Sequence, residues 1–155
     1  MGRVDYYHEQ DAPAANSLVV GSSAIVVDDG NRILLQRRRD SGNWALPGGT
    51  MDIGETLADS IIREVDEETG FRIQIDRIVG IYSDPGHVFA YDDGEIRQEF
   101  NICFACTITG GSLQVSSEST AVDFFDFADL ESLKIHESIR TRIRDYLRGG
   151  LPVLR

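Results

Sequence analysis

Three glutamates with helical spacing constrain this chain more than any other feature. Glu64, Glu67 and Glu68 stand at positions i, i+3 and i+4, so on a helix their carboxylates fall within roughly a 100° arc of its surface. Like charges at these spacings destabilise an isolated helix, which calls for a compensating cation. Carboxylate oxygens are the ligands that Mg²⁺ and Mn²⁺ prefer. The segment therefore predicts a helix that carries a hard-metal site.

The same segment has the signals of a capped helix. Thr56 is a suitable N-cap and Gly70 suits the position after the last turn, so we expect the helix to end near Thr69. Apolar residues form a stripe beside the acidic arc, which indicates that one face packs on a sheet while the adjoining edge holds metal. The stripe consists of Leu57, Ala58, Ile61, Ile62 and Val65.

Strand and turn signals alternate along the remaining chain. We expect an N-terminal arm at 1–16 that is loose or packs at an edge, a single domain at 17–150 and a C-terminal tail at 151–155. Strands at both sides of a packed helix predict an α/β fold with a mixed sheet between helices. The expected strands are 17–27, 32–39, 71–82, 99–109 and 121–127, with a polar loop at 83–96 and a closing amphipathic helix at 137–147.

Composition limits the possible partners. A net charge of -11 and a pI near 4.6 argue against DNA or RNA as the main partner. They do not argue against a small phosphorylated substrate, because a bound divalent metal reverses the local sign of charge. No apolar run suffices for a membrane span, and residues 1–16 lack the apolar core of a signal peptide. A cytoplasmic location without a membrane partner is expected by default.

Cys103 and Cys106 form a C-x-x-C motif within a strand-forming stretch. An offset of three on a strand sends the two side chains to opposite faces. That geometry disfavours a shared zinc ion or a disulfide, and no other cysteine is present to complete a metal site. We expect buried, reduced thiols.

Residues 49–71 as a whole resemble the Nudix box, whose pattern is G-x5-E-x7-R-E-U-x-E-E-x-G-U, with U a bulky aliphatic or aromatic residue. No position departs from it, and a chance match is on the order of 10⁻⁷. The resemblance implies an α/β/α sandwich and a hydrolase that cleaves nucleoside diphosphates linked to another moiety. The matching residues are Gly49, Glu55, Arg63, Glu64, Val65, Glu67, Glu68, Gly70 and Phe71.

Such a hydrolase uses divalent metal, here Mg²⁺ or Mn²⁺, to neutralise the diphosphate oxygens and activate water. Glu64 and Glu68 are the expected principal ligands and Glu67 a further one. The resemblance adds the backbone carbonyl of Gly48, where the absence of a side chain permits close approach.

The resemblance also implies that Arg63 orients the catalytic glutamates, with Glu55 as its partner, because a guanidinium fixes a carboxylate through two parallel bonds. The general base is either a box glutamate or one from a distal loop. Glu118 best resembles the distal residue, with Glu95 and Glu99 as alternatives.

Residues outside the box decide the substrate. Pro85 lies downstream of Phe71 at a spacing similar to that of a proline in the ADP-ribose-cleaving branch of the family. The array typical of NADH-cleaving members is absent, as is a Lys- and Arg-rich loop for polyphosphate. ADP-ribose or a nucleotide sugar is therefore the expected substrate.

Two alternative functions remain. One is a pyrophosphohydrolase of nucleoside triphosphates, oxidised nucleotides included, and the other is a sensor that binds nucleotide without turnover. Resemblance further suggests a possible homodimer.

Several side chains are candidates for substrate contact. Arg37 shares a strand face with Arg39 and is a candidate for phosphate contact, with plain surface exposure as the alternative. Tyr82 and the loop aromatics are candidates for stacking on the base. His87 is expected to be a solvent-exposed loop histidine, with a position facing the substrate as the alternative. The loop aromatics are Phe89 and Tyr91. Trp44 is expected to pack beside the glycine loop, with base stacking as the alternative.

Overall fold

The computed structural model describes residues 2–155, and its centre is one mixed sheet. The strands are β3 (Gly21–Val27), β4 (Arg32–Arg38), β5 (Trp44–Ala45), β6 (Gly48–Thr50), β7 (Phe71–Tyr82), β10 (Asn101–Gly111), β11 (Ser119–Asp126) and β12 (Val153–Leu154). Their order is β11-β4-β3-β10-β7-β12, with β5 on β4 and β6 on β3. β10 is parallel to β3 and antiparallel to β7. The predicted mixed sheet is confirmed.

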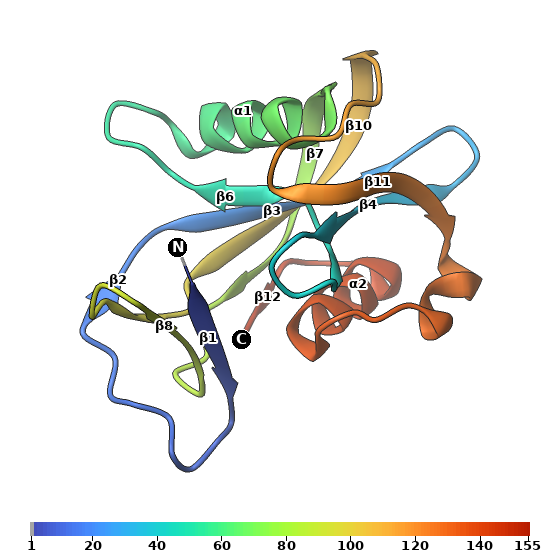
Figure 1. Cartoon of the computed structure of the whole chain (residues 1–155). Coiled ribbons are helices and arrows are strands. Elements are labelled where there is room, and N and C mark those ends of the chain that lie inside the picture. The colour runs from blue at the N-terminus through green and yellow to red at the C-terminus, as the bar shows by residue number, and fades with distance from the viewer. Residues whose placement is uncertain (1) are drawn as a thin grey trace.

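Helices cover both faces of the sheet (Figure 1). α1 (Leu57–Thr69) packs on one face and buries Ile61 and Val65 there. α2 (Glu137–Arg148) and the 3₁₀ helix η1 (Phe127–Ser132) pack on the other, where Ile143 and Leu130 are buried. The α/β/α sandwich predicted from the sequence is confirmed. None of the helices in residues 2–155 is long and apolar enough to cross a membrane.

α1 has the predicted ends. The Thr56 hydroxyl accepts a hydrogen bond from the backbone N–H of Asp59 at 3.1 Å, and Gly70 takes the left-handed conformation with φ 81°. Ala58 is exposed, so its place in the predicted apolar stripe was wrong. The stripe is narrower because position 58 lies past the edge of the face that meets the sheet.

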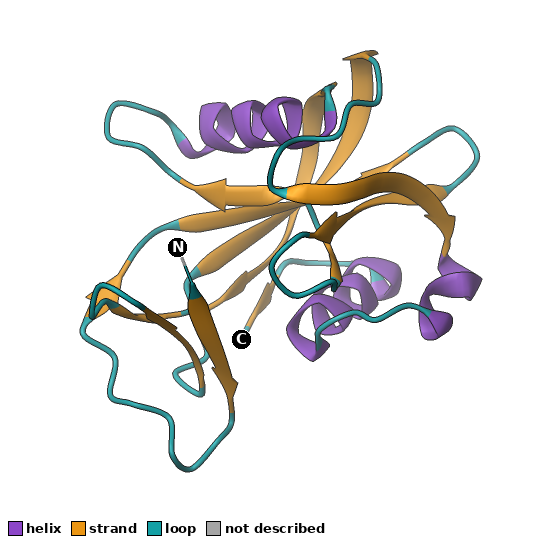
Figure 2. Cartoon of the chain, viewed as in Figure 1, coloured by secondary structure: helices purple, strands orange, loops and turns teal. Residues whose placement is uncertain are grey.

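A second sheet contains segments that were expected to be irregular. It consists of β1 (Arg3–Tyr7), β8 (His87–Tyr91), β9 (Ile96–Gln98) and β2 (Ser17–Leu18), in that order. Figure 2 shows these strands grouped apart from the helices. The predicted loop at 83–96 was therefore wrong, because β8 and β9 form a hairpin around Asp92-Asp93-Gly94 and β8 buries Val88 and Phe89.

The ends of the chain supply strands to both sheets. β1 pairs antiparallel with β8, from Arg3 opposite Tyr91 to Tyr7 opposite His87. β12 pairs parallel with β7. The division into arm, domain and tail stays a prediction, but the arm and the tail each contain a hydrogen-bonded strand.

The two cysteines lie on opposite faces of β10, as predicted. Cys103 belongs to the core under α2, and Cys106 to the core under α1. Both are free and buried. Burial raises the pKa of the Cys103 thiol to about 11 and that of Cys106 to about 12, so both are protonated at neutral pH.

Candidate active site

Glu68 is a buried carboxylate at the end of α1, only 7% exposed. It accepts hydrogen bonds from the Gln36 side-chain amide at 2.5 Å and from the Gly48 N–H at 2.9 Å. Burial raises its pKa to about 8, and the negative charges of Glu64 and Glu118 act in the same direction. Burial thus disfavours the ionised form of Glu68, and a cation bound nearby would stabilise it.

Glu64 lies against a strand position that only glycine fits. A Cβ added at Gly49 would come within 2.5 and 2.6 Å of the two Glu64 carboxylate oxygens. Burial raises the pKa of Glu64, the charges of Glu67 and Glu118 act with it, and Arg63 opposes it. The missing side chain at Gly49 therefore makes the space into which the Glu64 carboxylate projects.

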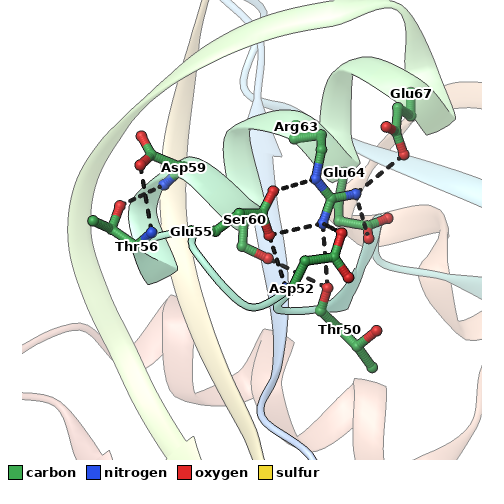
Figure 3. A network of polar contacts seen from close by, with 9 residues as sticks. All are labelled: Thr50, Asp52, Glu55, Thr56, Asp59, Ser60, Arg63, Glu64 and Glu67. Carbon is green, nitrogen blue, oxygen red and sulfur yellow. Dashed lines mark hydrogen bonds and ion pairs between the residues drawn. The ribbon is translucent and has the colours of Figure 1, made fainter.

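Arg63 holds the acidic groups in place (Figure 3). Its guanidinium makes a two-bond pair with Glu55, one of the bonds at 3.0 Å, and also donates to the Thr50 carbonyl at 3.3 Å. A further nitrogen donates to Glu64 at 2.9 Å and to Glu67 at 3.2 Å. The same contacts lower the pKa of Glu55 to about 2 and raise that of Arg63. This geometry is what an orienting role requires.

The donor set suits Mg²⁺ or Mn²⁺. Glu68 lies against Gly48 and Glu64 against Gly49, so the two carboxylates lie within one small region beside the backbone of β6. Across residues 2–155, no three Asp, Glu, His or Cys side chains gather closely enough to hold an ion by themselves. Mg²⁺ does not need such a group, because it is commonly held by one or two carboxylates, with water and substrate phosphate completing its shell. The residues present fit the metal.

Glu67 contributes differently from the other two glutamates. Its side chain is 61% exposed and is held by Arg63. The acidic arc predicted from the helix spacing therefore runs from a buried carboxylate, Glu68, through a half-buried one, Glu64, to a solvated one.

Glu118 lies close enough to the box for its charge to act on Glu64 and Glu68. It precedes β11, and its own backbone carbonyl accepts a hydrogen bond from the Arg39 N–H at 3.0 Å. The alternatives, Glu95 and Glu99, are each held by an arginine, at 3.0 and 2.6 Å. Of the three, Glu118 is the carboxylate whose charge acts on the box glutamates.

A cavity of about 460 Å³ adjoins the glycine strand and extends between the main sheet and the small one. That volume is in the usual range for a small-molecule site. Its walls combine aromatic rings with charged groups. They include Gly48, Gly49, Arg38, Trp44, Phe89 and Arg142.

The residues predicted to bind substrate lie elsewhere. Arg37 is exposed and donates to the Gly42 carbonyl at 3.3 Å, while the cavity wall holds Arg38 instead. The Tyr82 hydroxyl is buried against Asp145 at 2.8 Å. Pro85 is exposed, and neither it nor Tyr82 lines this cavity. The structure thus places none of the three at the cavity.

His87 was predicted to be solvent-exposed, and that was wrong: it is 4% exposed and lines the cavity. Two runs of alternate residues could have revealed this wall, since alternate side chains share one face of a strand. The first run is His87, Phe89 and Tyr91, and the second is Arg3, Asp5, Tyr7 and Glu9.

Comparison with known proteins decides the family. The family model described as the NUDIX domain matches residues 18–146, which is most of the chain. The chain belongs to the Nudix hydrolase family. The resemblance first seen in the box is confirmed, and the protein is a hydrolase of pyrophosphate bonds.

Two relatives and one solved structure are similar along most of their lengths. A MutT-like protein of Streptomyces ambofaciens is 35% identical over 95% of this chain and 87% of its own. An ADP-ribose pyrophosphatase of Methanocaldococcus jannaschii is 33% identical over 79% of this chain and 70% of its own. The crystal structure of a MutT protein from Methanosarcina mazei Go1 has a TM-score of 0.70 at 21% identity, over 86% and 95% of the two chains. Nudix hydrolases generally use divalent metals and act on small nucleotides.

Proposed function

We propose that this Nudix hydrolase cleaves the diphosphate bond of a nucleoside diphosphate derivative, of the ADP-ribose or nucleotide-sugar class. The observation that carries the proposal is the buried Glu68 carboxylate, which faces the Gly48–Gly49 strand beside Glu64, at the edge of a cavity large enough for a nucleotide. Phosphate groups bound at this edge would lie next to the carboxylates.

Glu64, Glu68 and the Gly48 carbonyl would hold Mg²⁺ or Mn²⁺, with Glu67 as a further ligand. The ion supplies charge neutralisation at the diphosphate and lowers the pKa of water. Arg63 keeps Glu64 and Glu67 oriented through its hydrogen bonds.

Glu118 is the proposed general base. Its carboxylate takes a proton from the attacking water, whose oxygen forms a bond to one phosphorus as the bond from that phosphorus to the bridging oxygen breaks. The products are two phosphate monoesters, a nucleoside monophosphate and a sugar phosphate.

The substrate class rests on one relative and one property of the site. The M. jannaschii relative is named an ADP-ribose pyrophosphatase. In this chain, the arginines that line the cavity are paired with carboxylates. The name of this relative and the pairing of these arginines both favour a substrate with a diphosphate and an uncharged end group. A third phosphate would need arginines that are not already paired.

Phosphate release from a panel of nucleotides with Mg²⁺ tests the function, with and without an added phosphatase. We expect ADP-ribose or a nucleotide sugar to give signal only with the phosphatase, and Glu68→Gln to abolish it. Glu131→Gln, which alters an exposed glutamate on η1, is the control and should retain full activity.

Other outcomes of this panel would replace the proposal. Pyrophosphate released from triphosphates would keep the site and change the substrate class. No hydrolysis, together with nucleotide binding that needs no metal, would indicate a sensor. The homodimer and the cytoplasmic location stay predictions from the sequence.

A further inference from the structure

The cavity beside the glycine strand contains polar atoms that the protein leaves without partners. The Ser22 hydroxyl, the Asn43 amide oxygen, the His87 Nε2 and the Arg142 Nε are buried and have no hydrogen-bond partner among residues 2–155. All four residues line this cavity. Buried polar groups in folded proteins are nearly always hydrogen-bonded, so these four atoms require partners that the protein itself does not supply, which a bound ligand or ordered water provides.

Two of these atoms belong to side chains that are themselves held rigidly. Arg142 is 4% exposed, and another of its nitrogens donates to Glu99 at 2.6 Å. His87 is also 4% exposed and stacks on His136 with ring centroids 5.2 Å apart. Their unpaired nitrogens are therefore fixed in position before any ligand arrives.

The charges of the cavity wall cancel. Each lining arginine is paired with a carboxylate within 3.1 Å, so none is left for a chain of phosphates. The pairs are Arg3–Asp5 at 2.9 Å, Arg38–Asp40 at 2.7 Å, Arg97–Glu95 at 3.0 Å and Arg142–Glu99 at 2.6 Å. Burial, and then the neighbouring His136, lower the pKa of His87 to about 4, so this imidazole is neutral at pH 7. The cavity accordingly suits an uncharged group.

Aromatic rings make up one part of the wall. Tyr7 contacts the edges of both His87 and His136, with ring centroids 5.1 Å apart in each case, and Phe89 lies 4.5 Å from His87. The guanidinium of Arg3 covers the Phe89 ring at 4.5 Å. Rings and guanidinium planes of this kind are the surfaces on which nucleobases stack in proteins.

We propose that this cavity binds the nucleobase of the substrate and that His87 and Arg142 hydrogen-bond to its edge. This inference rests on the proposed function, since it assigns the nucleoside end of a nucleotide substrate to the space beside the metal site. Arg142 Nε is a donor and needs an acceptor on the base, whereas His87 Nε2 pairs with a donor or an acceptor according to its tautomer. Because the charge of Arg142 is balanced by Glu99 and His87 is neutral, these hydrogen bonds give specificity without adding net charge to the cavity.

Equilibrium binding to the full chain with Mg²⁺ separates the base from the phosphate. The probes are the four common ribonucleoside monophosphates and ribose 5-phosphate, measured by calorimetry. We expect at least one monophosphate to bind about 10-fold or more tightly than ribose 5-phosphate, because a stacked base adds that much. Equal affinities for all five probes would overturn the inference.

His87→Phe removes the unpaired nitrogen and keeps an aromatic ring. We expect an unchanged or raised melting temperature, about 10-fold weaker binding of the preferred monophosphate and unchanged binding of ribose 5-phosphate. His8→Asn is the control, since His8 is exposed and lies outside the cavity wall. Should His87→Phe fail to fold, Ser22→Ala is measured in the same way. If His87→Phe folds and keeps the wild-type preference for the base, the proposed role of His87 is wrong. If Ser22→Ala also keeps this preference, the proposed base site is wrong.

The two proposals fail separately. Binding that ignores the base, in an enzyme that still hydrolyses its nucleotide substrate, removes the base site and leaves the proposed function. Base-selective binding in a protein that hydrolyses nothing removes the proposed function and leaves the base site.

Discussion

At the scale of single residues, Arg63 connects parts of the site that the chain supplies separately. Its guanidinium joins Glu55 and the Thr50 carbonyl, both before α1, to Glu64 and Glu67 on the helix. A planar group with five donors can satisfy all of these acceptors at once, and a lysine ammonium cannot do so in the same geometry.

We therefore expect Arg63→Lys to lower kcat by about 10- to 100-fold, as is usual for a residue that orients metal ligands. The melting temperature should change little, because lysine keeps the positive charge and these ion pairs are partly exposed to solvent. Steady-state kinetics with thermal denaturation checks this, with Arg72→Lys on the exposed side of β7 as the control. A loss of stability that accounts for the loss of activity would contradict the orienting role.

Glu118, in the turn before β11, is the proposed general base. If it is the general base, Glu118→Gln should lower kcat by about 10²- to 10⁴-fold while metal affinity stays nearly constant. Single-turnover kinetics and Mn²⁺ titration measure the two quantities. An equal loss in Glu95→Gln, whose carboxylate is occupied by Arg97, would assign the effect to general charge rather than to proton transfer.

At the scale of elements, the contact between β6 and α1 makes the site. β6 brings Gly48 and Gly49 so close to its neighbours that neither position has space for a Cβ, since Gly48 faces Ser22 of β3 and Gly49 faces Glu64. The helix can then place carboxylates directly beside the strand. Glycine is needed here for close approach, not for an unusual backbone angle.

Gly49→Ala should displace the Glu64 carboxylate and lower kcat by about 10-fold or more, with a smaller effect on folding, since the far end of a side chain can move. Gly30→Ala is the matched control because a Cβ there meets only side-chain atoms at contact distance, Asp28 Oδ1 at 3.4 Å and Arg32 Nε at 3.6 Å. Kinetics at saturating and limiting Mg²⁺ shows whether metal affinity has changed. Equal activity in both variants would mean that Glu64 is not positioned by this contact.

At the scale of the whole molecule, the buried His87 makes stability depend on pH. Its pKa is about 4 in the folded state and about 6.5 when unfolded. The unfolded chain therefore binds the proton first, and the stabilisation present above pH 6.5 is lost as the pH falls towards 4. The groups that surround this imidazole are His136, Asp5, Arg3, Arg142 and Glu99.

We expect the difference in unfolding free energy between wild type and His87→Phe to fall by up to about 3 kcal/mol as the pH is lowered from 7 to 4. Urea denaturation at several pH values measures it. Comparing the two proteins removes the contribution of the other acidic groups. A difference that stays constant over this range would show that folding does not change the pKa of His87.

Predictions from the sequence succeeded where the determining residues are neighbours along the chain. The cap at Thr56 and the stop at Gly70 depend on contacts within a few positions, and both were correct. Arg37 and Arg38 show the opposite case. Alternation places Arg38 on the side of β4 that also carries Gln36, the partner of Glu68, but which side faces the site depends on packing.

Local spacing and residue type were enough to predict the box helix, its acidic arc and the hydrolase family, because these depend on residues close together in the chain. The alternation of strand and helix signals also predicted the fold class, but not which strands pair. The tertiary structure alone decided the cavity wall. Its residues include members of β1, β8, β4 and α2, which lie far apart in the chain and meet only through strand pairing and helix packing. The choice of strand partners is a long-range interaction, and for this reason the unpaired nitrogens of His87 and Arg142 could not be read from the pattern of residues.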